Sequence, residues 1–417
     1  MLTLTPEDRA AAAGEQGAAR AMAMRIVAET GRLLGAGRLI DIASAHIDGC
    51  LYHGDSGVAF AERLVAGGGR VAVPATLNAG VLDLCQPGTV KADPHLREMG
   101  YRLQSAYEAL GCRPSWTCAP YQAGHRPAPG QHVAWGESNA VAFCNSVLGA
   151  RTNRYGDFLD ICCALTGRAP EAGLHLTENR CATVVVDTGA LSSDLKAMDV
   201  FYPVLGAWLG AAVGDAVAVI DGLPADTGED QLKALGAGAA STGAVGLFHV
   251  AGVTPEAPTL AAALGGRQAR ETIRLTPAKV RAARDRLSTV ADAAVDCIAL
   301  GSPHFSIDEF AALERHLRPG KPKLPIHVCT GRHVIDELER QGRLEPLKDA
   351  GIELIVDTCV VIAPVLPAGG GVLMTNSAKF AHYAPGNIGY GVVYGSLADC
   401  VATAYDGALS RDESLWR

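Results

Sequence analysis

The sequence predicts an α/β protein with parallel sheets, divided into two or three compact units. Its 417 residues are enough for that number of domains. Apolar runs of strand length alternate with segments of helical character, an order that is typical of parallel sheets. Glycine is abundant, with 48 residues, whereas aromatic residues make up only 5% of the chain. That composition suits short elements joined by many tight turns.

The first 80 residues predict a recurring order of strand, polar loop and helix. A helix is expected over residues 5–35, with Thr5 as its cap and an acidic first turn. A short strand over 38–44 is expected to run into a polar loop that contains His46 and Cys50. The remaining elements expected here are a helix over 60–65 and a strand over 70–74 that leads into residues 75–78.

The middle of the chain predicts strands over residues 183–186, 216–220 and 245–250, with alanine-rich helices among them. Charge density rises between residues 265 and 281, and a helix is expected to open at Thr276. We therefore place a domain boundary there. It divides the chain into a region 1–275, which carries most of the polar segments, and a second α/β unit, 276–417.

From residue 292 onward the alternation is clearest. A strand over 293–300 is expected to end in a turn, after which Ser306 and Glu309 form a capping box. Strands over 324–328 and 352–356 follow, with a helix between them that reaches residue 341. Ligands of such sheets lie beyond the carboxyl ends of the strands. The loops that carry Ser302, Cys329 and Cys359 are therefore predicted to converge on one site.

Composition excludes several other classes of protein. A net charge of −8 and the lack of a run of lysine and arginine argue against a nucleic-acid partner. No basic stretch followed by an apolar run opens the chain, so we expect no secretory signal and a cytoplasmic location. The most apolar stretch, residues 201–220, contains Asp215 and many small residues, and we expect buried core there, not a membrane span.

Twelve cysteines remain to be explained. Without a secretory signal a disulfide framework is not expected, and the absence of any CxxC pair argues against a zinc ribbon or a thioredoxin-type site. Most of the thiols are therefore predicted to be buried small side chains, with about three left for function.

Four segments combine polar residues with glycine between apolar runs, at residues 44–50, 135–139, 145–154 and 375–379. Each alone is explained by caps and turns. Four together favour a site for a small polar substrate, because buried polar groups need partners and such groups orient ligands.

These segments resemble the large subunit of the aconitase X family. The blocks that carry the resemblance are SAHIDGCLYHGDSG, AGGGRVAVPATLNAG, TCAPYQ, WGESNAVAFCNSVLGARTNRYGD, GLHLTENR, HVAGVTPEA, GSPHFS, DTCVVIAP and TNSAKFAHYAPG. They extend from about residue 40 to residue 405, nearly the whole chain. The resemblance implies a multi-domain, three-layer aconitase-like α/β fold and a hydro-lyase activity.

The resemblance implies two substrates in particular. Bacterial members dehydrate cis-3-hydroxy-L-proline to Δ1-pyrroline-2-carboxylate, and archaeal members dehydrate mevalonate 5-phosphate. Archaeal members carry a GCPH motif where this chain has GSPH, with Ser302 in place of the cysteine. We therefore expect the hydroxyproline reaction, with dehydration of mevalonate 5-phosphate or another small hydroxy acid as the alternative. A non-catalytic, iron-responsive regulatory protein is the alternative from another class.

The resemblance further implies iron, as an iron–sulfur cluster, with [2Fe–2S] favoured, or as a mononuclear ion. Thiolates are suitable soft ligands. Cys118 and Cys359 match cysteines of the family. For the third ligand Cys329 is favoured, because it is predicted to end a strand. Cys297 and Cys50 are the other candidates.

The remaining predicted site residues would hold the substrate. Arg151 and Lys379 are expected to bind its carboxylate. The pocket would be completed by His46, Ser138, Asn139, Asn145 and Asn153. Aconitase relatives also have a swivel domain with a serine base, which no block of this chain resembles, so we expect a separate small subunit. If the base lies in this chain, Ser377 and His46 are the candidates.

Overall fold

The structure, a computed structural model, describes residues 1–291 and 294–416. The chain divides into two compact units. The first comprises Met1–Leu82 and Ala92–Cys181, and the second comprises Asp83–Lys91 and Ala182–Arg417. The boundary predicted near residue 276 falls inside the second unit. Within the described part of the chain, no helix is long and apolar enough to cross a membrane.

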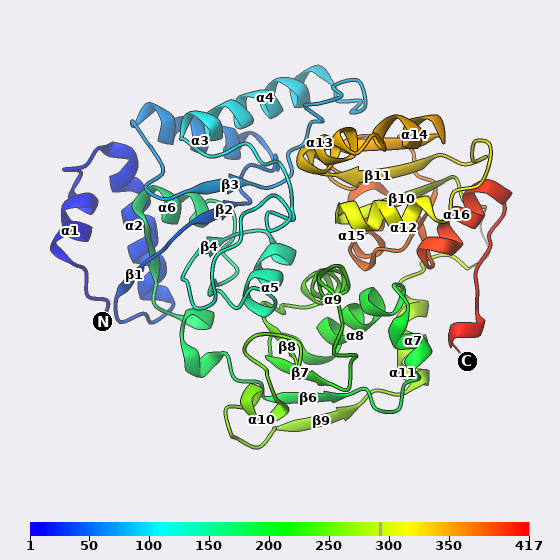
Figure 1. Cartoon of the computed structure of the whole chain (residues 1–417). Coiled ribbons are helices and arrows are strands. Elements are labelled where there is room, and N and C mark those ends of the chain that lie inside the picture. The colour runs from blue at the N-terminus through cyan, green and yellow to red at the C-terminus, as the bar shows by residue number, and fades with distance from the viewer. Residues whose placement is uncertain (292–293, 417) are drawn as a thin grey trace. The chain divides into compact units, whose positions relative to one another are not determined.

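The first unit is built around a three-stranded parallel sheet (Figure 1). Its strands lie in the order β3 (Ala75–Leu77), β2 (Ala45–Ile47) and β4 (Ala134–Trp135). A second, antiparallel pair joins β1 (Leu39–Asp41) to β5 (Arg168–Pro170). The helices of this unit are α1 (Pro6–Ala13), α2 (Ala18–Leu33), α3 (Asp55–Ala66), α4 (Pro94–Ala109), α5 (Ser138–Ser146) and α6 (Leu159–Thr166).

The helix predicted over residues 5–35 is wrong in one respect, because the segment forms two helices. Thr5 caps α1 as predicted, with its hydroxyl accepting the Asp8 N–H at 3.1 Å. The chain then turns between Gly14 and Gly17, whose φ angles of 98° and 96° favour glycine. These two residues separate α1 from α2.

Two predicted strand positions in this unit are also wrong. Residues 70–74 are not a strand, and β3 begins only after Pro74. Proline has no N–H to donate to a ladder, so it ends one more readily than it continues one. His46 lies inside β2 instead of in a loop, and the polar loop therefore begins at Asp48.

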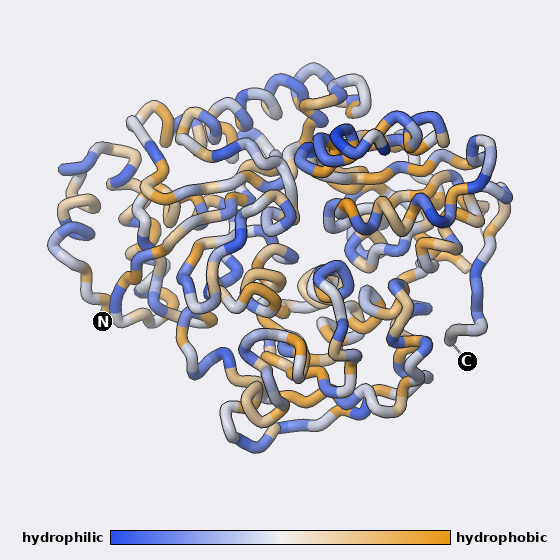
Figure 2. Tube along the Cα trace, viewed as in Figure 1, coloured by the Kyte–Doolittle hydropathy of each residue, from blue (hydrophilic) through white to orange (hydrophobic). Residues whose placement is uncertain are grey.

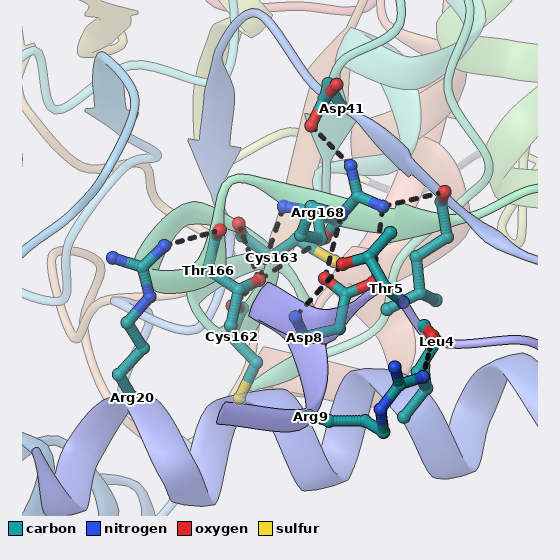
Figure 3. Close-up of polar contacts among 11 residues, drawn as sticks. Leu4, Thr5, Asp8, Arg9, Arg20, Asp41, Cys162, Cys163, Thr166 and Arg168 are labelled. Carbon is teal, nitrogen blue, oxygen red and sulfur yellow. Dashed lines mark hydrogen bonds and ion pairs between the residues drawn. The ribbon is translucent and has the colours of Figure 1, made fainter. Parts of the chain in front are cut away.

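Arg168 fastens α1 to the antiparallel pair (Figure 3). Its Nε lies 3.1 Å from Oδ1 of Asp8, a carboxylate that is only 3% exposed, and its Nη1 contacts Asp41. Nearby, Arg20 of α2 donates to the Thr166 carbonyl at 3.2 Å. A buried carboxylate without a cation partner is strongly unfavourable. Arg168 therefore stabilises the docked position of the first helix.

The second unit contains two parallel sheets (Figure 1). The four-stranded sheet has the order β8 (Phe248–Val250), β7 (Ala218–Asp221), β6 (Val184–Asp187) and β9 (Glu271–Arg274). The five-stranded sheet has the order β12 (Ile352–Val356), β11 (Ile326–Thr330), β10 (Cys297–Phe305), β13 (Val372–Thr375) and β14 (Gly391–Tyr394). The predicted α/β fold with parallel sheets is confirmed.

The helices of this unit are α7 (Ser193–Ala197), α8 (Phe201–Val213), α9 (Glu229–Thr242), α10 (Leu260–Ala263), α11 (Pro277–Arg286), α12 (Ile307–Glu314), α13 (Arg332–Arg340), α14 (Leu344–Asp349), α15 (Ala378–Ile388) and α16 (Leu397–Asp406). Helices α8 and α9 lie between the two sheets (Figure 1). A Cβ on Gly206 would lie 2.1 Å from the Leu235 carbonyl oxygen, so only glycine permits this approach. Residues 201–220, which were predicted to be buried core, form α8 and most of β7, and most of their side chains are buried.

The five-stranded sheet corrects two further expectations. Strand β10 continues through the predicted turn to Phe305, so Ser302 lies inside the strand, and its peptide bond to Pro303 is cis. Strand β11 runs to Thr330, so Cys329 lies inside it and not after it. Residue 293, the predicted start of the first strand, lies outside the described residues. Figure 2 shows hydrophobic residues along these strands and polar residues on α13.

Candidate functional site

The parallel sheet of the first unit brings three polar loops to one edge. Asp48 follows β2, Asn78 follows β3, and the segment 136–138 follows β4. All three strands run in the same direction, so these residues stand at the carboxyl end of the sheet. Ligands bind at that end of open parallel sheets. The edge is therefore the candidate substrate site of this unit.

Asp160 binds the loop after β2 and lies directly against the loop after β4. Its Oδ2 accepts the N–H groups of Asp48 and Gly49 and its Oδ1 accepts the Ile161 N–H, although its side chain is fully buried. A Cβ on Gly136 would lie 2.6 Å from Oδ2 of Asp160. Burial raises the pKa of the Asp160 carboxyl to about 8. Asp160 was not predicted to be a site residue, although one signal for it was its place as an acid inside the apolar segment LDICCALT.

His46 belongs to a buried chain of hydrogen bonds. Its Nδ1 lies 2.8 Å from the Thr76 hydroxyl, which lies 2.7 Å from Nδ1 of His125; Nε2 of His125 lies 2.8 Å from the Ser44 hydroxyl. Burial lowers the pKa of His46 well below its usual range and lowers that of His125 to about 4. Both imidazoles are therefore neutral. His46 has no exposed surface, so it has no direct access to a substrate.

Ser138 and Asn139 lie at the start of α5. Glu137 caps this helix by accepting the Ala140 N–H at 2.6 Å, and the partly exposed Ser138 donates to the same carboxylate at 3.4 Å. Asn139 is buried and donates to the Cys118 carbonyl at 3.2 Å. The structure thus brings the predicted residues Ser138, Asn139 and Cys118 together around one helix end.

Asn145, Arg151 and Asn153 bind groups of their own unit. Asn145 exchanges two hydrogen bonds with the backbone of Thr152, at 2.9 and 3.0 Å. Through Nη1, Arg151 donates to a backbone carbonyl and a threonine hydroxyl within residues 172–177, at 3.0 and 2.8 Å. Asn153 bonds to the backbone of the same segment, at 2.8 and 3.0 Å. Arg151 and Asn153 therefore hold the segment 172–177 in place.

The second unit contains a cavity of about 350 Å³. Three residues singled out in the sequence line it, namely Ser302, Ser377 and Lys379. The Ser377 hydroxyl accepts the Phe380 N–H at 3.1 Å, which caps α15, and it also donates to the Ser302 carbonyl. The cap explains why this serine stands at the end of β13, with Lys379 one half-turn further into the helix.

The same cavity contains a charge cluster that the sequence analysis missed. Lys233 of α9 is 1% exposed and lies 2.8 Å from Oδ1 of Asp230, and it contacts the carboxylate of Glu309. Although burial favours the neutral amine, the two carboxylates raise the pKa of Lys233. Burial raises the pKa of Glu309 to about 7, against the effect of the lysine. Glu309 also completes the predicted capping box with Ser306, which is confirmed.

The loop that carries Cys359 is anchored by two carboxylates. Asp357, at a φ of 64°, accepts two hydrogen bonds from Arg332, at 3.0 and 2.6 Å. Asp83 accepts the Val356 N–H at 2.9 Å and so ties the segment 83–91 to the end of β12. The Cys359 loop is thus held in a defined position directly beyond a strand end.

The five candidate iron ligands differ in exposure. Cys118, in the first unit, and Cys359, in the second, are each 9% exposed, whereas Cys329 is fully buried within β11. Burial raises the pKa of the Cys297 thiol to about 12 and raises that of Cys50 well above its usual value. Among the residues that the structure describes, no three His, Cys, Asp or Glu side chains lie close enough together to hold a metal. Cys118 and Cys359 are the two most exposed of the five thiols.

Comparison with known proteins agrees with this fold. The chain matches the models of three aconitase X domains: the first over residues 1–178, the second over 182–285 and the third over 295–406. A crystal structure of Thermococcus kodakaraensis aconitase X in its holo-form has a TM-score of 0.86 and 32% identity, over 96% of this chain and 100% of that one.

Curated relatives give the same result. Over 98% of this chain, it is 46% identical to the cis-3-hydroxy-L-proline dehydratase of Pseudomonas aeruginosa, and over 97% it is 41% identical to that of Hypocrea jecorina. It covers 71% and 69% of those proteins. It is 39% identical to the phosphomevalonate dehydratase large subunit of Methanothermobacter thermautotrophicus, over 91% of this chain and 93% of that subunit.

The fold and these relatives define an enzyme of the hydro-lyase class, which removes water from its substrate. The chain belongs to the aconitase X family. The family resemblance seen in the sequence is thereby confirmed.

Proposed function

We propose that this chain is the catalytic subunit of an iron-dependent dehydratase that converts cis-3-hydroxy-L-proline to Δ1-pyrroline-2-carboxylate. The observation that carries the proposal is its identity of 46% and 41%, over nearly the whole chain, to two proteins named for that activity. Identity to the phosphomevalonate dehydratase large subunits is 39% or less. Ser302, in place of the archaeal cysteine, is a second argument for the hydroxyproline substrate.

The reaction removes the hydroxyl from C3 of the ring and the proton from C2. The enamine that results tautomerises to the Δ1 imine. Iron, when bound, supplies a Lewis acid for the departing hydroxyl. Lys379 is the best-placed candidate for the substrate carboxylate, because it lines a cavity together with Ser302 and Ser377. Arg151, the other candidate, already binds a carbonyl and a hydroxyl of its own unit.

We propose Cys118 and Cys359 as iron ligands, because both lie on loops and retain some exposure. Cys329 remains the candidate for the third position, with Cys297 and Cys50 as alternatives. Its burial within a strand makes Cys329 a weaker candidate than its predicted position at a strand end suggested. A [2Fe–2S] cluster and a mononuclear iron both suit thiolate ligands.

A small second subunit is the proposed partner. Several relatives that this chain matches over most of their length are named large subunits, which supports a partner of this kind. We propose that it carries the swivel domain and the base that takes the C2 proton, and that the complex works in the cytoplasm. Within this chain Ser377 is the more accessible candidate base, since His46 is fully buried.

The proposal is tested by initial rates measured on the iron-loaded complex with three substrates. We expect turnover of cis-3-hydroxy-L-proline, and little of trans-3-hydroxy-L-proline or mevalonate 5-phosphate. Preference for mevalonate 5-phosphate would establish the alternative substrate instead. Iron binding without turnover of any of the three would favour the regulatory alternative.

A further inference from the structure

Asp48 lies at the carboxyl end of the parallel strands of the first unit, and the proposed reaction assigns no role to its carboxylate. Along β2, His46 and Asp48 are two residues apart and so lie on the same face, as do Thr76 and Asn78 along β3. On this face, buried His46 contacts Thr76 on the neighbouring strand. Two residues further along both strands, the amide nitrogen of Asn78 donates to Oδ1 of Asp48. The Asp48 carboxylate is thus the last group of this polar face at the carboxyl end of the sheet.

Asp48 is the carboxylate at this edge that reaches solvent. Asp160 is fully buried and accepts three backbone N–H groups, and Glu137 is 4% exposed and caps α5. Asp48, in contrast, is partly exposed. Of the acids at this edge, it is therefore the one placed to meet a ligand.

The orientation of Asp48 is set by its neighbours. Asp160 binds its backbone N–H, and Asn78 binds its side chain. A Cβ on Gly136 would lie 2.7 Å from the Asp48 Cβ, so the loop after β4 packs directly against it. Asn78 is itself 4% exposed, and its Oδ1 has no hydrogen-bond partner among the described residues. A preorganised carboxylate with a buried, unused amide oxygen beside it has the features of a site for a hydrogen-bond donor that carries positive charge.

The proposed substrate has such a group. The ring nitrogen of cis-3-hydroxy-L-proline is a secondary ammonium with two N–H donors. We propose that Asp48, held by Asn78 and Asp160, binds this ring ammonium, with the Asn78 amide oxygen available to the second N–H. The proposal rests on the proposed function. It also makes Asp48 a determinant of specificity, because mevalonate 5-phosphate has no ammonium group.

The test compares two ligands that differ in the ring nitrogen. L-proline carries both the carboxylate and the ammonium, whereas cyclopentanecarboxylate carries the carboxylate alone. Their dissociation constants would be measured by calorimetry on the full, iron-loaded complex and on its Asp48→Asn variant. A hydrogen bond to a charged group predicts that the parent protein prefers L-proline by roughly 10- to 100-fold. The variant should lose this preference and keep its affinity for cyclopentanecarboxylate.

Two further variants make the result specific. Asn78→Ala should reduce the preference for L-proline by a smaller factor, because it loosens Asp48 without removing its charge. Asp41→Asn, at an acid of the same unit whose side chain is 89% exposed, should leave both affinities unchanged. Equal weakening of both ligands in Asp48→Asn would overturn the proposal, since it would mean that Asp48 only supports the fold. A preference that survives in the variant would also overturn it.

The two proposals fail separately. Turnover of cis-3-hydroxy-L-proline together with an unchanged preference in Asp48→Asn would overturn the role of Asp48 alone. Loss of the preference in a protein that does not turn over hydroxyproline would support the ammonium site and overturn the proposed reaction.

Discussion

Replacing Lys233 with methionine would remove the one cation of the cluster that joins α9 to α12 and would keep most of the side-chain volume. The lysine side chain is 1% exposed, and its two acidic partners, Asp230 and Glu309, are 33% and 24% exposed. Removal of one partner from a buried ion pair destabilises a protein by about 3–5 kcal/mol, because the remaining charge loses its compensation. Since both carboxylates keep some solvent contact, we expect the lower end, about 3 kcal/mol.

Equilibrium unfolding in urea would measure this effect as a shift of the midpoint at an unchanged slope. Lys348→Met is the matched control, because Lys348 also pairs with an acid three residues away, Glu345, at 2.8 Å, but is 45% exposed. We expect the control to lose less than about 0.5 kcal/mol. Adding Glu309→Gln to Lys233→Met should recover part of the loss. A loss below about 1 kcal/mol in Lys233→Met would refute the reasoning that the buried ammonium compensates both acids.

Three further predictions follow from the site and from the buried histidines. Replacing Cys118 or Cys359 with alanine should abolish both iron binding and activity, and Cys329→Ala should lose more iron than Cys297→Ala. Metal analysis of the purified variants checks both predictions. Full iron content in Cys359→Ala would show that Cys359 is not an iron ligand. Burial lowers the pKa of His125 to about 4 and that of His175 and His304 to about 3, so these imidazoles take up protons only on unfolding, and each should remove up to about 1.4 kcal/mol of stability per pH unit as the pH drops from 6.5 toward 4. The buried acids Asp160 and Glu309, whose pKa values burial raises to about 8 and about 7, act in the opposite direction over this range. Compared with the parent, His125→Gln should therefore gain in relative stability between pH 6.5 and pH 5, and an identical pH dependence of the two urea midpoints would contradict this. The chain without its partner should bind pyrrole-2-carboxylate weakly and be inactive, since a positioned base contributes roughly 10²–10⁴-fold to the rate; robust turnover by the verified single chain would place the base within it.

Local signals in the sequence predicted local structure well. Thr5, Thr276 and Ser306 each cap the helix that was expected to begin after them, because a cap depends on residues only two or three positions away. Strand boundaries were less predictable. The run after residue 70 has strand character, yet the ladder begins only after Pro74. Thr330 extends β11 beyond the apolar run because it pairs with Val356 of β12 and with Phe305 of β10, partners that the sequence does not reveal.

The candidate site could be predicted only in part, for the same reason. The polar segments 135–139 and 375–379 lie at strand ends, but 44–50 contains β2 and 145–154 begins at the end of α5. Ser302, Ser377 and Lys379 line one cavity. Asp160 and Lys233 were missed because their partners are distant in the chain: Asp48 lies 112 residues from Asp160, and Glu309 lies 76 residues from Lys233. Such contacts are set by tertiary packing, which periodicity and spacing do not encode.

The most direct test of the central claim is mass spectrometry of the product formed from cis-3-hydroxy-L-proline whose 3-hydroxyl is labelled with heavy oxygen. The iron-loaded complex should release Δ1-pyrroline-2-carboxylate without the heavy oxygen, because the C3 hydroxyl leaves as water. A product that retains the heavy oxygen, or recovery of unchanged substrate from a complex that is fully loaded with iron and partner, would contradict the proposed dehydration.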